Sequence, residues 1–336
     1  MRAKVSSISP ANIAFIKYWG MRDEVAILPE NVSLSMTLSC CVSHCTAETL
    51  TGNVDDEVWW KNERDELVPA PEKFRVGVLN HLHQLRRYVS GSSPVRVAIH
   101  NNFPTGAGIA SSASAFSSLA FTISHLWQHQ QPKDIEQLSL LSRLSGSGSA
   151  ARSVTGGYVE WPGNAEDAGS EARQLAPAGH WQLYDIIAVV DTGHKGVSSR
   201  EGHRRAASSP YYSERQRLLP ARLEQVRQAI LRRDFTQLAD VVERESIDLH
   251  VIAMTSSPPI FYWLPATLAV LAAVRQLRTD GLELCATLDA GPNVHVICSA
   301  AHYLLVKKEI SQIPGVLSTI TDRVGDGPHI TEAHLF

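Results

Sequence analysis

A stretch rich in glycine, alanine and serine lies at residues 104–116 and reads PTGAGIASSASAF. Gly106 and Gly108 let the backbone curl so that its N–H groups converge. The apolar run that follows predicts a helix, whose unpaired N-terminal N–H groups and positive dipole end attract an anion. The hydroxyl groups of Ser111 and Ser112 can bind phosphate oxygens or a magnesium ion. The stretch therefore indicates a phosphate site.

This motif differs from the two common phosphate-binding loops. No lysine follows the glycines, as GxxxxGK[ST] requires, and Ser111 stands at the last glycine position of GxGxxG. Three small residues leave room for a triphosphate to lie close to the chain: Ala107, Ala110 and Ala113. The alternative is a tight turn and helix N-cap, with small residues that serve only helix packing.

Two further stretches place charged groups at the ends of apolar strands. In NIAFIKYWGMRDE, residues 12–24, Lys17 and Tyr18 follow such a strand and can reach into a cleft. In LDAGPNVHVI, residues 288–297, Asp289 precedes a Gly-Pro turn, where partial burial suits a general base. The alternatives are an edge lysine with its head in water and a turn aspartate before glycine.

A third stretch, SGSGSAARSVTGGYVEW at residues 145–161, combines small hydroxyl residues with an arginine. Ser147, Ser149 and Arg152 fall near the start of a helical segment. A guanidinium group can bind a carboxylate or phosphate through two parallel hydrogen bonds. The alternative is a flexible Gly/Ser joint.

The elements that must position these residues are mixed strands and helices without regular βαβ alternation, which indicates an α+β fold. Alternation of apolar and polar residues predicts strands through much of the first hundred residues. The apolar segment 181–193 predicts a buried strand that begins the second half of the chain. A helical region at 213–254 is predicted to break at Pro220. The Pro258–Pro259 pair excludes a regular helix just after it.

Composition excludes several classes of protein. The 336 residues carry a net charge of −3, so no basic excess indicates nucleic acid. Five cysteines without a CxxC pair favour free thiols in a reducing cytosol over a zinc or redox motif. The N-terminus lacks a signal-peptide pattern, and no run of about 18 apolar residues exists. We expect a cytoplasmic protein with no membrane span.

Six blocks in order resemble one family: NIAFIKYWG, FPTGAGIASSASAF, GSGSAARS with GGYVEW, KGVSSREG, SSPPIFY and LDAGPNV. Over residues 8–295 the chain resembles the mevalonate-pathway decarboxylases of the GHMP superfamily. The resemblance implies an N-terminal lobe like ribosomal protein S5 domain 2, residues 1–184, and a ferredoxin-like C-terminal lobe, residues 185–336. The active site is then expected between the lobes, in a homodimer.

The resemblance also implies the chemistry. Family members use ATP and Mg²⁺ to phosphorylate the tertiary 3-hydroxyl of mevalonate 5-phosphate or 5-diphosphate. Loss of phosphate and CO₂ then gives an isopentenyl phosphate ester. Such a protein binds a small phosphorylated substrate and no nucleic acid or membrane.

Roles carry over to matching positions. Asp289 matches the proposed general base, Lys17 the lysine near the transferred phosphoryl group, and Arg152 the group on the substrate carboxylate. Ser147 matches a group that holds the substrate, and Ser149 faces the phosphate region. The positions that match the ATP-phosphate loop, with Ser112 near the metal, are Gly106, Gly108, Ala110, Ser111 and Ser112. The positions around the 5-phosphoryl end are Tyr18, Lys73, Ser199 and Arg200.

Position 21 departs from the pattern. Diphosphomevalonate decarboxylases typically read KYWGK there, whereas this chain reads KYWGMRDE, as does a branch that resembles the phosphomevalonate decarboxylases. A lost charge-assisted contact costs about 1.5–3 kcal/mol. Compensating charges are available at Arg22, Arg200, His203, Arg204 and Arg205. We therefore expect conversion of mevalonate 5-phosphate to isopentenyl phosphate, with the diphosphate reaction as the alternative.

Two other activities remain as alternatives. A mevalonate 3-kinase would phosphorylate without decarboxylation, but members of that kind tend to lack the aspartate and lysine present here as Asp289 and Lys17. A non-catalytic GHMP-fold protein would only bind a ligand. The presence of Ser112 and Arg152 beside that pair favours the full reaction.

Overall fold

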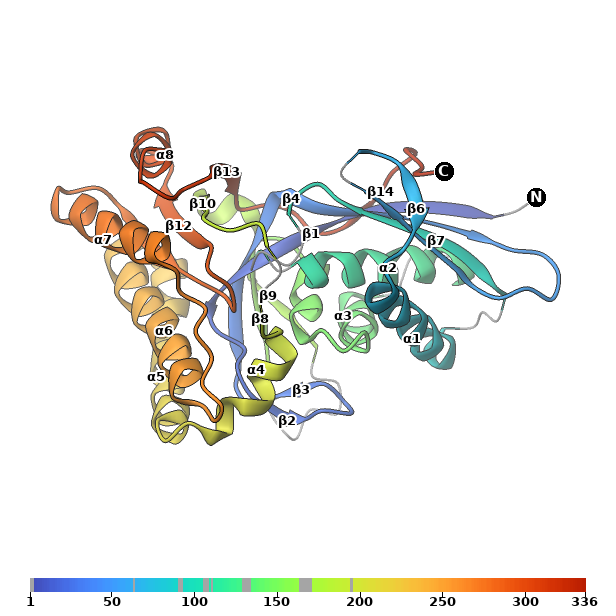
Figure 1. Cartoon of the computed structure of the whole chain (residues 1–336), viewed down its shortest axis with the longest axis horizontal. Coiled ribbons are helices and arrows are strands. Elements are labelled where there is room, and N and C mark those ends of the chain that lie inside the picture. Colours follow the sequence, from blue (N-terminus) through green and yellow to red (C-terminus); the bar gives the residue numbers. More distant parts are fainter. Residues whose placement is uncertain are drawn as a thin grey trace.

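The computed structural model describes residues 3–62, 64–89, 93–104, 109, 111–128, 134–162, 171–193 and 196–336. Two β-sheets, each covered by helices, lie end to end along the long axis of the molecule (Figure 1). No helix in these ranges is long and apolar enough to cross a membrane.

The larger sheet has eight strands and carries the first half of the site. Its hydrogen-bonded order is β14-β1-β4-β7-β5-β6, with β8 beside β4 and β9 beside β8. The strands are β1 (Lys4–Ile16), β4 (Ser33–Thr49), β5 (Glu57–Lys61), β6 (Leu67–Pro69), β7 (Val95–Asn101), β8 (Tyr158–Trp161), β9 (Arg173–Ala176) and β14 (His329–Ile330). A small hairpin follows β1: β2 (Met21–Asp23) and β3 (Leu28–Pro29).

Helices cover one face of this sheet (Figure 1): α1 (Glu72–Tyr88), α2 (Ser111–Gln128), α3 (Ile135–Arg143) and the 3₁₀ helix η1 (Gly148–Val154). Small hydroxyl residues let α2 approach β1 and β4 closely. They pair with one another across the interface, as in Ser7 with Thr122 at 2.6 Å and Ser9 with Ser117 at 2.7 Å. Buried hydroxyls are thereby satisfied without any charge.

The smaller sheet has the order β11-β12-β10-β13. The strands are β10 (Leu183–Val189), β11 (Leu284–Thr287), β12 (Val294–Ser299) and β13 (Ser318–Arg323). One face packs on α7 (Pro265–Thr279) and α8 (Tyr303–Ser311), and the other packs toward the first sheet and α5 (Tyr212–Arg232) and α6 (Phe235–Thr255). The short helix α4 (Ser199–Arg205) follows β10.

The end of the chain returns to the N-terminal sheet, although the predicted division at residue 184 assigns it to the C-terminal lobe. Strand β14 pairs antiparallel with β1, at the edge of the larger sheet, although it follows the smaller sheet in sequence. The division into residues 1–184 and 185–336 stays a prediction.

The predicted helix break at Pro220 is wrong. Helix α5 continues through Pro220 and ends at Arg232, because Arg233 adopts a left-handed conformation (φ 60°) before α6 begins. Pro220 lies on the exposed side of α5, so the carbonyl group it leaves without an N–H partner can bond water. The prediction that the Pro258–Pro259 segment is not helical is confirmed, since it lies between α6 and α7.

Candidate active site

A cavity of about 840 Å³ opens where the end of β1, the starts of α2 and η1, helices α1 and α4, and the turn after β11 meet. Its lining therefore comes from both halves of the chain. The predicted site residues in this lining are Lys17, Tyr18, Lys73, Ser111, Ser112, Ser147, Ser149, Arg152, Ser199, Arg200 and Asp289. Gly106, Gly108 and Ala110 lie outside the described residues.

Lys17 and Asp289 form an ion pair on the wall of this cavity, with Lys17 Nζ 2.9 Å from Asp289 Oδ1. The Lys17 side chain is 1% exposed and the Asp289 side chain 27%, so the carboxylate is the member that faces the open space. Burial lowers the pKa of Lys17 and outweighs the effect of Asp289. Burial alone would raise the pKa of Asp289, but Lys17, His295 and Arg152 together hold it below its ordinary value. The cavity thus presents an ionised carboxylate.

A buried ion-pair network fixes the main chain of Lys17. Glu245 of α6 accepts the Lys17 N–H at 3.2 Å, and Arg215 of α5 donates to the Lys17 carbonyl at 2.9 Å. Arg215 and Arg222 both pair with Glu245. The C-terminal helices therefore hold the end of β1, so Lys17 cannot shift relative to Asp289 without breaking this network.

Arg152 is a buried cation held only by neutral groups. It donates to Asn12 at 3.2 Å, Ser33 at 2.6 Å and Ser35 at 3.1 Å, and its side chain lines the cavity. Burial lowers the pKa of Arg152 to about 10. Within the described ranges no carboxylate lies within 4.0 Å of it. A buried guanidinium without a counter-ion is costly, so the site favours a bound anion beside Arg152.

The Gly/Ser segment before η1 is closely packed rather than a flexible joint. A Cβ atom on Gly148 would lie 2.5 Å from Trp161 and 2.6 Å from Tyr18, and one on Gly146 would lie 2.0 Å from Arg200. Arg200 donates to the Gly146 carbonyl at 2.9 Å. Glycine at these two positions lets the segment contact both cavity walls.

Three serine hydroxyls adjoin the start of α2. Ser112 Oγ lies 3.3 Å from Ser147 Oγ, which lies 3.2 Å from Ser149 Oγ. No group of three or more His, Cys, Asp or Glu side chains within the described ranges could hold a metal ion. Mg²⁺ is commonly bound by one or two protein oxygens together with substrate phosphates. A hydroxyl such as that of Ser112 fits a magnesium ion that arrives with a nucleotide.

Met21 lines the same cavity, so the departure at this position lies in the site. Of the residues expected to compensate for the missing lysine at position 21, Arg200 and His203 line the cavity. Lys73, which was predicted at the 5-phosphoryl end, lines it as well. Arg204 instead pairs with Glu24, and Arg205 pairs with Glu201. Arg22, the residue after Met21 on β2, is not in this lining, so Arg200 and His203 are the expected compensating residues that share the cavity with Met21.

Sequence reasoning missed part of the wall that α1 contributes. Val76, Gly77, Asn80 and Gln84 line the cavity with Lys73, at spacings that place them on one helix face. That spacing was a usable signal once Lys73 had been chosen. Glu245 and Arg215 had no comparable signal, because nothing local links them to Lys17.

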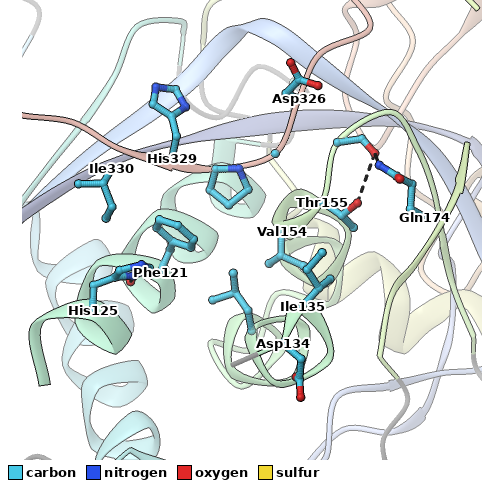
Figure 2. A pocket seen from close by; sticks show the side chains of 14 residues that line it. Phe121, His125, Asp134, Ile135, Val154, Thr155, Gln174, Asp326, His329 and Ile330 are labelled. Atoms are coloured by element: carbon cyan, nitrogen blue, oxygen red, sulfur yellow. Dashed lines mark hydrogen bonds between the residues drawn. The ribbon is translucent and has the colours of Figure 1, made fainter. Parts of the chain in front are cut away.

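A second cavity, of about 810 Å³, lies behind η1 and contains none of the predicted site residues. Figure 2 shows its wall: Phe121 and His125 from α2, Ile135 from α3, and His329 and Ile330 from β14. Gln174 donates to the Gly156 carbonyl at 2.7 Å. The charged pair and the serine cluster all face the first cavity.

Comparison with known proteins identifies both halves of the chain. Residues 9–172 match the family model described as the diphosphomevalonate decarboxylase-like N-terminal domain. Residues 185–323 match that of the mevalonate 5-diphosphate decarboxylase C-terminal domain. The diphosphomevalonate decarboxylase of Aspergillus fumigatus is 34% identical over 94% of this chain and 80% of its own. That of Candida albicans is 32% identical over 98% of each.

Solved structures agree with these matches. Mevalonate diphosphate decarboxylase from Staphylococcus aureus superposes with a TM-score of 0.90, at 29% identity, over 99% of both chains. The structure of MDDEF in complex with MVAPP, AMPPCP and magnesium gives a TM-score of 0.88, at 31% identity, over 99% of this chain and 100% of that one.

Fold and site together define an ATP-dependent decarboxylase of α+β GHMP architecture, which confirms the predicted fold class and enzyme class. The chain belongs to the diphosphomevalonate decarboxylase family.

Proposed function

We propose that this protein converts mevalonate 5-diphosphate to isopentenyl diphosphate, with consumption of ATP and release of ADP, phosphate and CO₂. The relatives from Aspergillus fumigatus, Candida albicans and Homo sapiens, at 32–34% identity, carry the diphospho name. This supports the alternative expected from the sequence better than the monophosphate reaction. The observation that carries the mechanism is that the Lys17–Asp289 pair lines one cavity with Arg152, which is buried and has no carboxylate partner among the described residues.

Asp289 acts as the general base for the 3-hydroxyl. Its carboxylate is held ionised and faces the cavity, while Lys17 fixes one of its oxygens. Removal of the proton makes the substrate's 3-hydroxyl oxygen a nucleophile toward the γ-phosphoryl group of ATP. Lys17 places positive charge beside the phosphoryl oxygens. Arg152 binds the substrate carboxylate and so sets which face of carbon 3 meets Asp289.

Phosphorylation turns a poor leaving group into a good one. When phosphate leaves, positive charge builds at carbon 3, and the electron pair of the carboxylate C–C bond forms the double bond as CO₂ departs. Arg152, itself buried, is positioned to hold the carboxylate until that bond breaks. Lys17 and Arg152 are almost fully buried, so water screens their charges little.

ATP binds at the start of α2, where helix N–H groups and the Ser111 and Ser112 hydroxyls meet the phosphates. Gly106, Gly108 and Ala110 remain predicted contacts of the same loop. Mg²⁺ supplies charge neutralisation on the phosphates when bound, with Ser112 as its protein ligand. Ser147 and Ser149 adjoin this point and bind the transferred group or the substrate.

The 5-diphosphate end lies toward α1 and α4. Tyr18, Lys73, Ser199 and Arg200 line the cavity. The His203 ring is tilted at 40° to the Tyr18 ring, with 4.1 Å between the ring centroids. Met21 in the same lining favours a second candidate, decarboxylation of mevalonate 5-phosphate, because it adds no charge near a terminal phosphate. The homodimer and the cytoplasmic location remain predictions.

Steady-state kinetics with purified protein, ATP and Mg²⁺ separate these candidates. We expect kcat/KM for mevalonate 5-diphosphate to exceed that for mevalonate 5-phosphate. The opposite ranking would establish the monophosphate as substrate. ADP formation without CO₂ from either compound would make the protein a 3-kinase and end the proposal.

A lysine at position 21 tests the role of that wall. Met21→Lys adds a cation beside the 5-phosphoryl end, so kcat/KM for the diphosphate should rise about ten- to a hundredfold relative to the monophosphate. Val25→Lys is the matched control, because Val25 is 93% exposed and outside the cavity lining. An equal effect of both substitutions would show that position 21 does not contact the substrate's tail.

Removal of the buried arginine tests how the carboxylate is held. Arg152→Gln should lower kcat/KM about ten- to a hundredfold, mainly through KM, because one charge-assisted contact is lost. Arg87→Gln, on the exposed face of α1, is the control and should leave the kinetics unchanged. A wild-type KM for the Arg152→Gln enzyme would contradict the assignment.

A further inference from the structure

A further buried charged pair lies on the C-terminal sheet, outside the cavity lining. His295 Nδ1 of β12 is 2.6 Å from Asp185 Oδ2 of β10, and both side chains are at most 1% exposed. In the strand register Ile187 faces His295 and Ile297 faces Asp185. The two residues therefore lie diagonally on one face of the sheet, the face that packs toward the first lobe.

This pair is not explained by stability alone. His295 Nε2 and Asp185 Oδ1 each lack a hydrogen-bond partner among the described residues. Apolar side chains of similar size often match or exceed the stability of a buried ion pair, and orphaned polar atoms add to its cost. A pair retained in this form calls for a role beyond packing.

The pair adjoins Asp289 through the β11–β12 hairpin. Thr287, the last residue of β11, is the cross-strand partner of His295, and Asp289 follows Thr287 by two residues. Asp289 is thus paired with Lys17 of β1. His295 lies on β12, the strand that pairs with β11, and β11 leads into the turn that carries Asp289. Burial alone would lower the pKa of His295, but Asp185 and its hydrogen bond raise it. His295 is among the cations that lower the pKa of Asp289.

The other charged groups around this point are already matched. Asp322 of β13 accepts the N–H groups of Ser39, Cys40 and Cys41. Glu245 of α6 is paired with two arginines.

Two groups remain near Asp289. Arg152 belongs to the cavity wall and binds substrate in our proposal. His250 of α6 is neutral, since burial lowers its pKa to about 3. Of the described cationic groups that lower the pKa of Asp289, His295 is then the one that contacts no substrate in our proposal.

We propose that His295, held by Asp185, is a positioning residue: it places a buried positive charge behind the turn that carries Asp289, so that the Asp289 carboxylate stays ionised. It neither touches substrate nor transfers a proton. This inference rests on the proposed role of Asp289.

The direct test is a carboxyl ¹³C titration of Asp289, assigned by its absence in Asp289→Asn. His295→Gln can keep a hydrogen bond to Asp185 but loses the charge, so the midpoint for Asp289 should rise by about one pH unit. His295→Lys restores a cation and should return the midpoint toward that of the wild type. The acid limb of kcat/KM should move in the same direction, with the same substrate throughout.

The matched control is His81→Gln, a buried histidine of α1 whose Nε2–H donates to the Leu141 carbonyl. His81 packs against Phe116 but does not itself line the cavity. It should lower the melting temperature without moving the Asp289 midpoint. If His295→Gln does not fold, Asp185→Asn is measured instead, with the same upward shift expected because His295 loses its counter-ion.

An unmoved Asp289 midpoint in His295→Gln or Asp185→Asn, with only a lower melting temperature, would overturn the inference and leave the pair as packing. Failure of the proposed function is distinguishable, because it appears as absent CO₂ release by the wild-type enzyme while the titration remains measurable.

Discussion

The Asp289→Asn enzyme is expected to lose at least about 10³-fold in kcat while binding ATP with little change. Asparagine has the same shape but cannot take the 3-hydroxyl proton, and it leaves the enclosed Lys17 ammonium without its partner at 2.9 Å. ATP binding should persist because the nucleotide phosphates are proposed to bind at the start of α2, where other residues form the cavity wall. Single-turnover CO₂ release and a nucleotide binding titration measure the two effects separately.

The control for this substitution is Asp280→Asn, at the exposed end of α7. It makes the same chemical change away from the cavity, so its kinetics should match those of the wild type. Turnover of Asp289→Asn within tenfold of the wild type would show that another group removes the proton.

The second large effect concerns the ion-pair network that holds Lys17. Glu245→Gln should lower the free energy of unfolding by about 3–5 kcal/mol, because removing one partner of a buried pair strands the other charge. Arg215 would be left as a buried charge without a carboxylate partner, since its side chain is 2% exposed and pairs with Glu245. Arg222 also pairs with Asp248 and would keep that partner. Chemical denaturation measures the loss.

Activity should fall in the same variant, because Arg215, which also donates to the Lys17 carbonyl, loses its carboxylate partner and the end of β1 can shift away from Asp289. Glu214→Gln is the control: Glu214 pairs with Arg217 on the exposed surface of α5, and such pairs contribute little. Wild-type stability in Glu245→Gln would mean that the network neither stabilises the chain nor positions Lys17.

The sequence alone predicted the site better than the elements around it. Lys17 and Asp289 are 272 residues apart, yet each was placed at a strand end by its flanking apolar run, and the structure joins them in one ion pair. Resemblance to a family supplied the pairing that local patterns lack. The Gly/Ser segment at 145–149 lines the same cavity, but its close packing depends on Trp161 and Arg200, which only the folded chain brings near.

Other features depended on solvent exposure or long-range contacts. Pro220 predicted a helix break because the sequence does not show which side of α5 faces water. Glu245 and the Asp185–His295 pair carry no local signal, since their partners come from distant elements. The number of phosphates on the substrate also could not be predicted from the sequence. Met21 removes one positive charge from the site, whereas Lys73, Arg200 and His203 line the same cavity.

The most direct test of the account is the stoichiometry of products from mevalonate 5-diphosphate, ATP and Mg²⁺ with the purified protein. The account predicts one ADP and one CO₂ for each isopentenyl diphosphate formed, with both lost together in Asp289→Asn. ADP released without CO₂, or CO₂ released only from mevalonate 5-phosphate, would contradict it.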